Sequence, residues 1–266
     1  MGSRTPSIID LNAEAAKLTT GITRLGSYRD GILLLGRSAG SKGHWETHRE
    51  DELLHILDGS RTLDIVEQDG PHSYAVDAGM IAIVPAGAWH RVRSTGAGTV
   101  MSATIPGEHI ELDVDDPRTV EPGKVMAGGP PSIIDLTAEL AKLKMFRRTP
   151  EATVADRKGS VAQLAPYRDG LLLAIKASGK DHWERHLTGD ELIHVLDGSL
   201  TLEIVSDDGP PRSYPLRAGL IAVIPQGAWH RFHCPEGATQ LALTPFPGDT
   251  VEADIDDPRT IERKPA

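Results

Sequence analysis

Histidine and glutamate residues crowd one short segment of the chain, which reads GHWETHREDELLHILDG over residues 43–59. His44, Glu46 and His48 occupy alternate positions, so an extended backbone would place these three side chains on one face of a strand. Glu52 follows after a short polar loop. Buried acids and imidazoles are costly unless they are paired or bind a metal, and divalent first-row metals prefer such mixed donors. The segment therefore indicates a metal site.

A second segment supplies another histidine, and both segments occur twice in the chain. Residues 79–90 read GMIAIVPAGAWH and residues 219–230 read GLIAVIPQGAWH, each ending in a histidine. The first segment returns at 181–198 as DHWERHLTGDELIHVLDG. In chain order the candidates are His44, Glu46, His48, Glu52 and His90 in one copy, and His182, Glu184, His186, Glu191 and His230 in the other. This repetition predicts two sites of one kind.

The repetition extends over most of the 266 residues. PSIIDLNAEAAKL at 6–18 matches PSIIDLTAELAKL at 131–143, and DVDDPRTVE at 113–121 matches DIDDPRTIE at 254–262. Each repeat is as long as an ordinary domain. We therefore interpret the chain as a duplicated domain.

The predicted domain boundaries follow this repeat. The first domain spans 1–121, the second spans 132–266, and the Gly- and Pro-rich stretch 122–131 is the linker. The second domain carries 14 additional residues around KMFRRTPEATVADRKG, at 144–159. We interpret the basic residues there as the solvated face of a short helix capped by Asp135, in preference to a site for an anionic partner. These residues are Lys142, Lys144, Arg147 and Arg148.

After the helix, each repeat reads as a series of short strands. GILLLG at 31–36 and MIAIVP at 80–85 are continuous apolar runs, whereas RTLDIVE at 61–67 alternates apolar and polar residues. Asp-Gly pairs in LDGS, QDGP and DDGP favour hairpin turns between strands. Short strands at regular spacing predict an all-β protein built as an antiparallel sandwich or barrel.

Composition limits the classes of partner. The net charge of −10 and the lack of a basic stripe disfavour nucleic acid and anionic membranes. Cys234 is the only cysteine, so the chain can form neither an internal disulfide nor a cysteine-based zinc site. The sequence begins without an apolar leader and contains no run of 18 apolar residues, so we expect a cytoplasmic protein.

With these motifs in view, the sequence resembles the cupin family, and its two copies resemble a bicupin. The second cupin motif has the pattern G-x5-P-x-G-x2-H. The first motif ends in the pattern H-x3-E-x6-G or H-x4-E-x6-G. Residues of this chain that match them are His48, Glu52, Gly59, Gly79, Pro85, Gly87 and His90, then His186, Glu191, Gly198, Gly219, Pro225, Gly227 and His230. The resemblance implies two tandem jelly-roll β-barrels about a pseudo-twofold axis, each preceded by a short helix. It also implies one metal ion in each barrel, held by three histidines and one glutamate.

The sequence departs from the family pattern at one ligand position in each repeat. Glu46 and Glu184 stand where the first histidine of the His-x-His motif belongs. Glutamate could replace that histidine as a ligand, which gives two histidines and two glutamates around Fe, Mn or Zn. Alternatively, His44 or His182 could reach the metal while the glutamate withdraws. In a third interpretation no metal binds, and the acids make local hydrogen bonds.

The metal sphere suggests several functions. Two histidines with a carboxylate resemble the arrangement in non-haem iron oxygenases, so we expect a dioxygenase-type enzyme acting on a small organic molecule. The glutamates Glu46, Glu52, Glu184 and Glu191 are also candidates for catalytic bases. The alternatives are a metal-dependent isomerase, epimerase or lyase, and a non-catalytic binding module. An oligomer of identical chains is compatible with the apolar strands.

Three further residues are expected to lie outside the sites. His55 and His194 follow the ligand glutamates by three residues, in the opposite strand phase, so they should face the outer side or an interface. No redox role is expected for Cys234, because the first repeat has Ser94 at that position.

Overall fold

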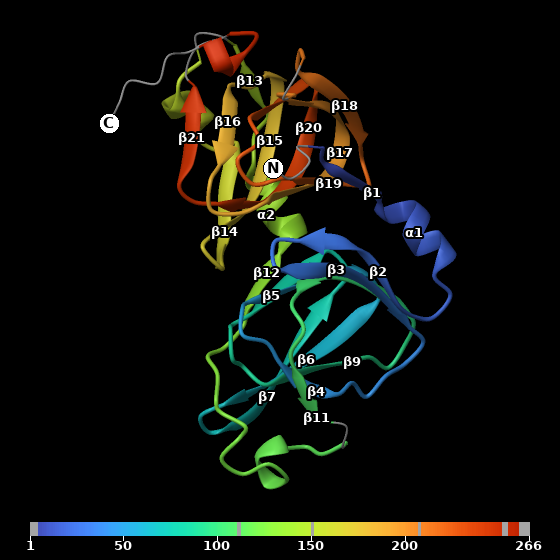
Figure 1. Ribbon diagram of the computed structural model, residues 1–266. Coiled ribbons are helices and arrows are strands. Elements are labelled where there is room, and N and C mark those ends of the chain that lie inside the picture. The colour runs from blue at the N-terminus through green and yellow to red at the C-terminus, as the bar shows by residue number, and fades with distance from the viewer. Residues whose placement is uncertain (1–4, 111–112, 150–151, 207–208, 252–254, 261–266) are drawn as a thin grey trace. The chain divides into compact units, whose positions relative to one another are not determined.

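The protein is built almost entirely of strands, as predicted (Figure 1). The computed structural model describes residues 5–110, 113–149, 152–206, 209–251 and 255–260. The elements of the first repeat are β1 (Ser7–Asp10), α1 (Leu11–Lys17), β2 (Gly21–Tyr28), β3 (Gly31–Ser38), β4 (Trp45–Thr47), β5 (Glu52–Asp58), β6 (Ser60–Glu67), β7 (Gly70–Asp77), β8 (Met80–Val84), β9 (His90–Arg93), β10 (Gly98–Thr104), β11 (Glu108–Ile110) and the 3₁₀ helix η1 (Pro117–Thr119).

The second repeat follows the same order, with two extra elements after its helix. Its elements are β12 (Ser132–Asp135), α2 (Leu136–Lys142), β13 (Phe146–Arg148), η2 (Val154–Arg157), β14 (Val161–Tyr167), β15 (Gly170–Lys180), β16 (Trp183–His186), β17 (Glu191–Ile204), β18 (Arg212–Arg217), β19 (Leu220–Ile224), β20 (His230–Pro245), β21 (Gly248–Val251) and η3 (Pro258–Thr260). Both predicted short helices are confirmed, and each spans seven residues.

Two antiparallel sheets form the barrel of the first repeat. One sheet has the order β12-β8-β5-β10-β3-β2 and the other has the order β11-β4-β9-β6-β7. Apolar side chains from β5, β6 and β8, among them Ile56, Leu63 and Ala82, meet in one buried cluster. Burial of these side chains stabilises the barrel by about 25 cal/mol per Å² of apolar surface. In the second repeat, β17 and β20 are long enough to take part in both halves of the barrel.

One predicted hairpin turn is instead a corner between sheets. Asp58-Gly59 joins β5, in one sheet, to β6, in the other, and these strands do not pair with each other. Gly59 has φ +74°, and a Cβ atom there would collide with the carbonyl oxygen of Ala97. The glycine is therefore needed for a sharp bend. The turn at Asp69-Gly70 does close a hairpin, between β6 and β7. The third pair, Asp208-Gly209, lies partly outside the described residues.

The first strand of each repeat joins the barrel of the other repeat. Strand β1 pairs with β19, with Ile9 opposite Ile221, and β12 pairs with β8, with Ile134 opposite Ile81. The compact units are accordingly residues 1–11 with 142–266, and residues 12–141. The boundaries of these units differ from the domain boundaries predicted from the repeat, because β1 and β12 each belong to the other unit. Both strands read SIID, so sequence similarity alone does not reveal which barrel each strand enters.

The basic segment after α2 differs from its predicted form. Asp135 caps the helix, because its carboxylate accepts a hydrogen bond from the amide of Ala138 at 2.9 Å. The helix ends at Lys142, and Phe146–Arg148 forms a strand parallel to β15. Lys142, Lys144 and Arg147 are exposed as expected, but Arg148 is buried. The interpretation of Arg148 as a solvated helix residue was wrong, because strand pairing turns its side chain inward.

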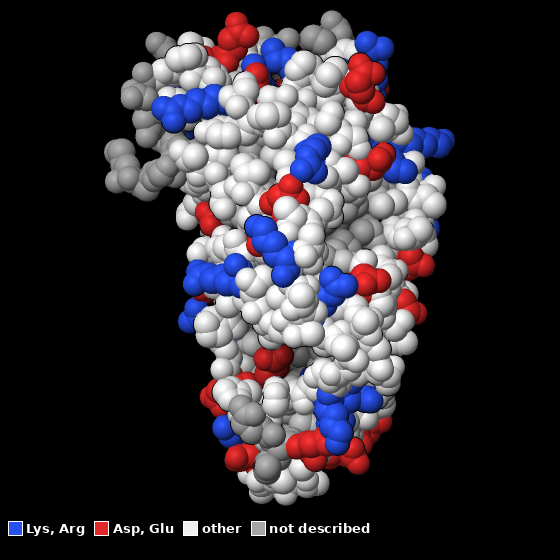
Figure 2. All heavy atoms as spheres, turned by 90° about the vertical axis from the view of Figure 1, so that its right-hand side faces the viewer, with Lys and Arg blue, Asp and Glu red and all other residues white. Residues whose placement is uncertain are grey.

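Neither α-helix within the described ranges approaches the roughly 20 residues that a membrane-spanning helix requires. On the face shown in Figure 2, Lys and Arg side chains are interspersed with Asp and Glu side chains. The exclusion of nucleic acid stays a prediction.

The exchanged strands give a direct test of this topology. Ile9 is 6% exposed, so Ile9→Ala should destabilise the barrel of the second repeat by about 2–4 kcal/mol. Amide hydrogen exchange should accelerate in β19 and remain unchanged in β8. Ile134→Ala should produce the reverse pattern. Ile8→Ala is the control, because Ile8 lies on the same strand and is 40% exposed. Faster exchange in β8 after Ile9→Ala would contradict the pairing.

Candidate metal centre

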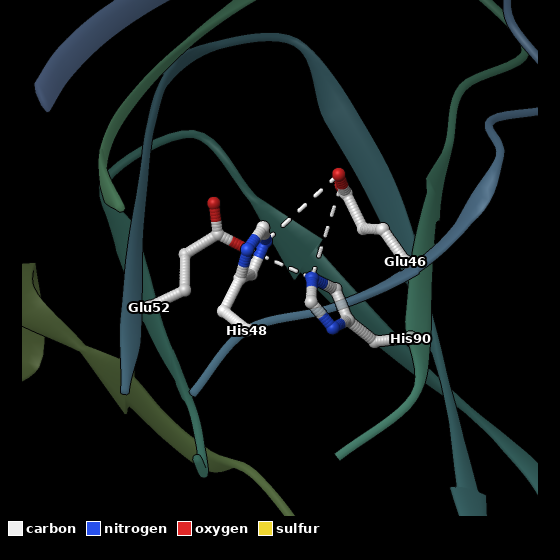
Figure 3. Close-up of side chains that lie close together, drawn as sticks. All are labelled: Glu46, His48, Glu52 and His90. Atoms are coloured by element: carbon white, nitrogen blue, oxygen red, sulfur yellow. Dashed lines mark hydrogen bonds and ion pairs between the residues drawn. The ribbon is translucent and has the colours of Figure 1, made fainter. Parts of the chain in front are cut away.

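Three strands bring the candidate residues of the first repeat together. Glu46 lies on β4 opposite His90, which begins β9, and Glu52 begins β5. His48 follows β4 directly. Figure 3 shows the four side chains converging inside the barrel. One donor atom from each residue lies within 4.8 Å of all the others. The separate sequence motifs therefore meet at one point.

An anchored tryptophan fixes the orientation of β4. The ring of Trp45 is fully buried, and its indole nitrogen donates a hydrogen bond to the carbonyl of Val114 at 2.8 Å. The guanidinium of Arg91 stacks on that ring at 4.8 Å. Because side chains alternate along a strand, holding Trp45 on the outer side directs Glu46 inward. Trp183 and Arg231 form the same pair in the second repeat.

The first cluster is closely spaced. His90 Nε2 lies 2.8 Å from Glu52 Oε2, and His48 Nε2 lies 3.8 Å from the same oxygen. Glu46 completes the group, with its carboxylate oxygens 3.8 Å from His48 Nε2 and 3.9 Å from His90 Nε2. The Nδ1 atom of His90 faces the carbonyl of Ala88 at 3.1 Å, which orients the ring with Nε2 toward the cluster.

The second cluster repeats this geometry. His230 Nε2 lies 2.9 Å from Glu191 Oε2, and His186 Nε2 lies 3.5 Å from Glu191 Oε1. Glu184 Oε1 lies 3.8 Å from His230 Nε2. The hydroxyl of Thr244 donates a hydrogen bond to Glu191 Oε1 at 2.7 Å. The four residues Glu184, His186, Glu191 and His230 again offer donor atoms within 4.8 Å of one another.

Each cluster holds one buried and one partly exposed carboxylate close together. Burial, and then the negative charge of Glu52, raise the pKa of Glu46. Burial and the charge of Glu191 raise the pKa of Glu184 to about 7. Burial opposes the charge on His230, but its contacts with Glu191 outweigh that effect and raise its pKa to about 9. Without a cation, the protonated imidazole thus compensates the charge of the first acid, and the second acid avoids adding a further negative charge by holding its proton.

The donor atoms fit a divalent cation. At the second cluster, both ring nitrogens of His186, together with His230 Nε2 and Glu191 Oε2, are buried without an aligned hydrogen-bond partner among the described residues. Such atoms are costly to bury unless they have a ligand. Imidazole nitrogen and carboxylate oxygen are donors for Mn, Fe and Zn. Each barrel therefore contains one candidate metal site.

The structure distinguishes the glutamates from their histidine alternatives. Glu46 and Glu184 belong to the two clusters, whereas His44 is exposed and His182 is buried beside Arg148. His55 and His194 also lie outside the clusters, as their strand phase predicted, and both are buried. Burial raises the pKa of the Cys234 thiol to about 11, which makes its reactive thiolate scarce.

Two features of the sites were not predicted from the sequence. Thr244 hydrogen-bonds to Glu191 near the end of β20, and its equivalent Thr104, the last residue of β10, lowers the pKa of Glu52 by hydrogen bonding. The signal was present, because a threonine occupies this position in both repeats. The contact of Arg148 with His182 had no such signal, since the first repeat lacks the segment that supplies the arginine.

Comparison with known proteins agrees with the fold and the site. The model of the cupin domain family matches residues 37–106 and 171–244, which together exceed half of the chain. The chain therefore belongs to the cupin family, and its two domains make it a bicupin. A search of curated proteins finds no match.

Solved structures show the same architecture at low sequence identity. A structure of oxalate decarboxylase from Bacillus subtilis has a TM-score of 0.58 and 13% identity, covering 94% of this chain and 81% of that chain. A cupin 2 conserved barrel domain protein from Leptotrichia buccalis has a TM-score of 0.55 and 12% identity, covering 91% of this chain and 96% of that chain.

Buried His194 should make the protein sensitive to acid. Burial lowers the pKa of His194 to about 4, so the unfolded chain, with its ordinary pKa near 6.5, binds the proton more readily. Stability should therefore fall as the pH drops from about 6.5 to 4, by about 3 kcal/mol from this residue. Urea unfolding of the wild type and His194→Gln over this range should show a smaller loss in the variant. His233→Gln, at an exposed histidine, is the control, and parallel curves for all three proteins would contradict the prediction.

Proposed function

We propose that the protein is a metal-dependent enzyme of dioxygenase type that acts on a small organic molecule. Each barrel would bind one divalent ion, of Fe, Mn or Zn, through two histidines and two glutamates. The observation that carries this proposal is the convergence of these four donors, from separate strands, in both repeats. Buried donors without aligned partners at the second cluster support it further.

The assigned ligands are Glu46, His48, Glu52 and His90 in the first barrel, and Glu184, His186, Glu191 and His230 in the second. A bound ion would supply a Lewis acid and a meeting point for oxygen ligands. The chain would contribute the remaining parts: a buried, oriented imidazole pair, a carboxylate held by a threonine, and a second carboxylate nearer to solvent. The Mn(II) centres of Bacillus subtilis oxalate decarboxylase support manganese as the first ion to test.

The two glutamates of each cluster are placed for different roles. Glu52 and Glu191 retain about a twentieth of their side-chain surface, whereas Glu46 and Glu184 retain 41% and 30%. The more exposed glutamate would lie on the side from which a small molecule arrives. We assign it the further role of moving a proton to or from the substrate, while the buried glutamate holds the imidazoles in place.

This placement also favours a second candidate function. Proton transfer by Glu46 or Glu184 suffices for an isomerase, epimerase or lyase, which consumes no oxygen. The enzyme from Bacillus subtilis that shares the fold is named as a decarboxylase and not as a dioxygenase. A non-catalytic binding module would need neither the exposed glutamate nor the cation.

Metal content tests the proposed sites. Protein purified without a chelator or a His-tag and loaded with Mn²⁺, Fe²⁺ or Zn²⁺ should contain two ions per chain by elemental analysis. Glu52→Gln should reduce this to about one, because it removes a buried ligand from one barrel only. Glu50→Gln, in the same loop, should retain two ions. Less than about a tenth of an ion per barrel after loading would leave only the binding module.

The same measurement decides the role of Glu46. If this residue is a ligand, Glu46→Gln should lower the occupancy of the first barrel, whereas unchanged occupancy would show that it is not.

Oxygen uptake then separates the two reaction classes. The iron-loaded enzyme should consume oxygen with a 1,3-diketone or a catechol. Turnover of a substrate by the manganese or zinc form, without any oxygen consumption, would move the assignment to the isomerase and lyase class.

A further inference from the structure

The 14 residues unique to the second repeat place positive charge beside its metal cluster. Strand β13 pairs with the end of β15, with Arg148 opposite Gly179. The Arg148 side chain is only 5% exposed, and its Nη1 atom lies 2.9 Å from Asp181 Oδ1. Its Nη2 atom contacts Nδ1 of His182. Arg157, at the end of η2, reaches the same Asp181 oxygen at 3.3 Å. We refer to Arg148, Arg157, Asp181 and His182 as the arginine cluster.

The arginine cluster lies next to the proposed metal ligands. His182 lies two residues before Glu184, directly before β16, and is buried. The backbone amide of Asp181 donates a hydrogen bond to the carbonyl of Phe232 at 2.8 Å, two residues after the candidate ligand His230. This contact holds Asp181 next to the strand that supplies His230.

The guanidinium groups of the arginine cluster share a single carboxylate among the described residues. Arg148 and Arg157 both contact Asp181 Oδ1, at 2.9 and 3.3 Å. The Nε atoms of Arg148 and Arg157 are buried without a hydrogen-bond partner among the described residues. A buried N–H donor without an acceptor is costly, and an anion that accepts a hydrogen bond from it would remove that cost.

The first barrel has no equivalent of this arrangement. Gly43 stands where the second repeat has Asp181, with φ +70°, and a Cβ atom there would collide with the carbonyl oxygen of Val92. His44, at the position of His182, is exposed. The chain passes from α1 to β2 without a counterpart of β13. A divalent ion with two glutamates would leave the first site neutral, whereas the second would carry one excess positive charge.

We propose that Arg148, supported by Arg157, forms an anion-binding subsite in the second barrel, so that this barrel selects a small carboxylate while the first barrel takes a neutral ligand. The inference rests on the proposed function in assuming that ligands approach the metal cluster, and it assigns the two barrels different substrates. Arg148 is the residue that determines specificity, since its buried Nε–H has no partner among the described residues and can donate a charge-assisted hydrogen bond to a carboxylate.

A matched pair of ligands tests the subsite. Isothermal titration calorimetry would compare glycolate with glycolamide, which has a similar size and no charge, on full-length protein. The wild type should prefer glycolate at one site per chain. Arg148→Gln should weaken glycolate at least about tenfold, as expected for a charge-assisted hydrogen bond, and leave glycolamide unchanged. Arg148→Lys should retain part of the preference. Arg147→Gln, on the exposed face of the same strand, is the control.

The results separate specificity from structural support. If Arg148 served only to hold the fold, Arg148→Gln would weaken both ligands equally and lower the melting temperature. Equal binding of the two ligands to the wild type, no glycolate binding at all, or a preference that survives Arg148→Gln would each overturn the proposal. If Arg148→Gln does not fold, Arg157→Gln removes the same unit of charge from a more exposed side chain and should reduce the preference likewise.

Titrations of both metal-free and Mn²⁺-loaded protein keep this test independent of the proposed function. A chain that binds no metal would refute the metal-dependent activity. Its glycolate preference, and the loss of that preference in Arg148→Gln, would still decide whether the subsite exists.

Discussion

Two carboxylates and two imidazoles packed within a few ångströms are the constraint around which each barrel is organised. Such a group is stable only when its charges compensate one another. Without a cation, the imidazole of His230 acquires a raised pKa and Glu184 retains its proton at near-neutral pH. A divalent ion would satisfy the same donors by its own charge. The surrounding barrel can be understood as the scaffold that holds these four side chains at short range.

The scaffold achieves this by fixing strands from the outside. Trp45 is buried, hydrogen-bonded to Val114 and covered by Arg91, so β4 cannot rotate to turn Glu46 away from the interior. The pairing of Glu46 with His90 across two strands then sets their separation. The second repeat reproduces these contacts with Trp183 and Arg231. Site geometry thus depends on side chains that never face the site.

The two repeats share the candidate metal cluster but differ in the residues that surround it. The candidate ligand sets have the same composition and similar distances between donor atoms. The segments next to them differ, because the second repeat adds β13 and η2 and replaces Gly43 by Asp181. The buried side chain of Arg148 has no counterpart among the described residues of the first repeat. Two chemically similar centres are therefore placed in different electrostatic environments within a single chain.

The sequence by itself determined the duplicated β architecture, the helix before each barrel, and the histidine and glutamate pattern of each candidate site, but it left open whether Glu46 or His44 completes the first group. These follow from local rules: alternation along strands, motif spacing and the repetition of both in one chain. The tertiary structure decided which barrel receives each SIID strand, because the two strands are identical over four residues. It also decided that Asp58-Gly59 turns a corner between sheets, where the local sequence is equally suited to a hairpin. The burial of Arg148 likewise depends on pairing with β15, a distant segment whose position no local pattern records.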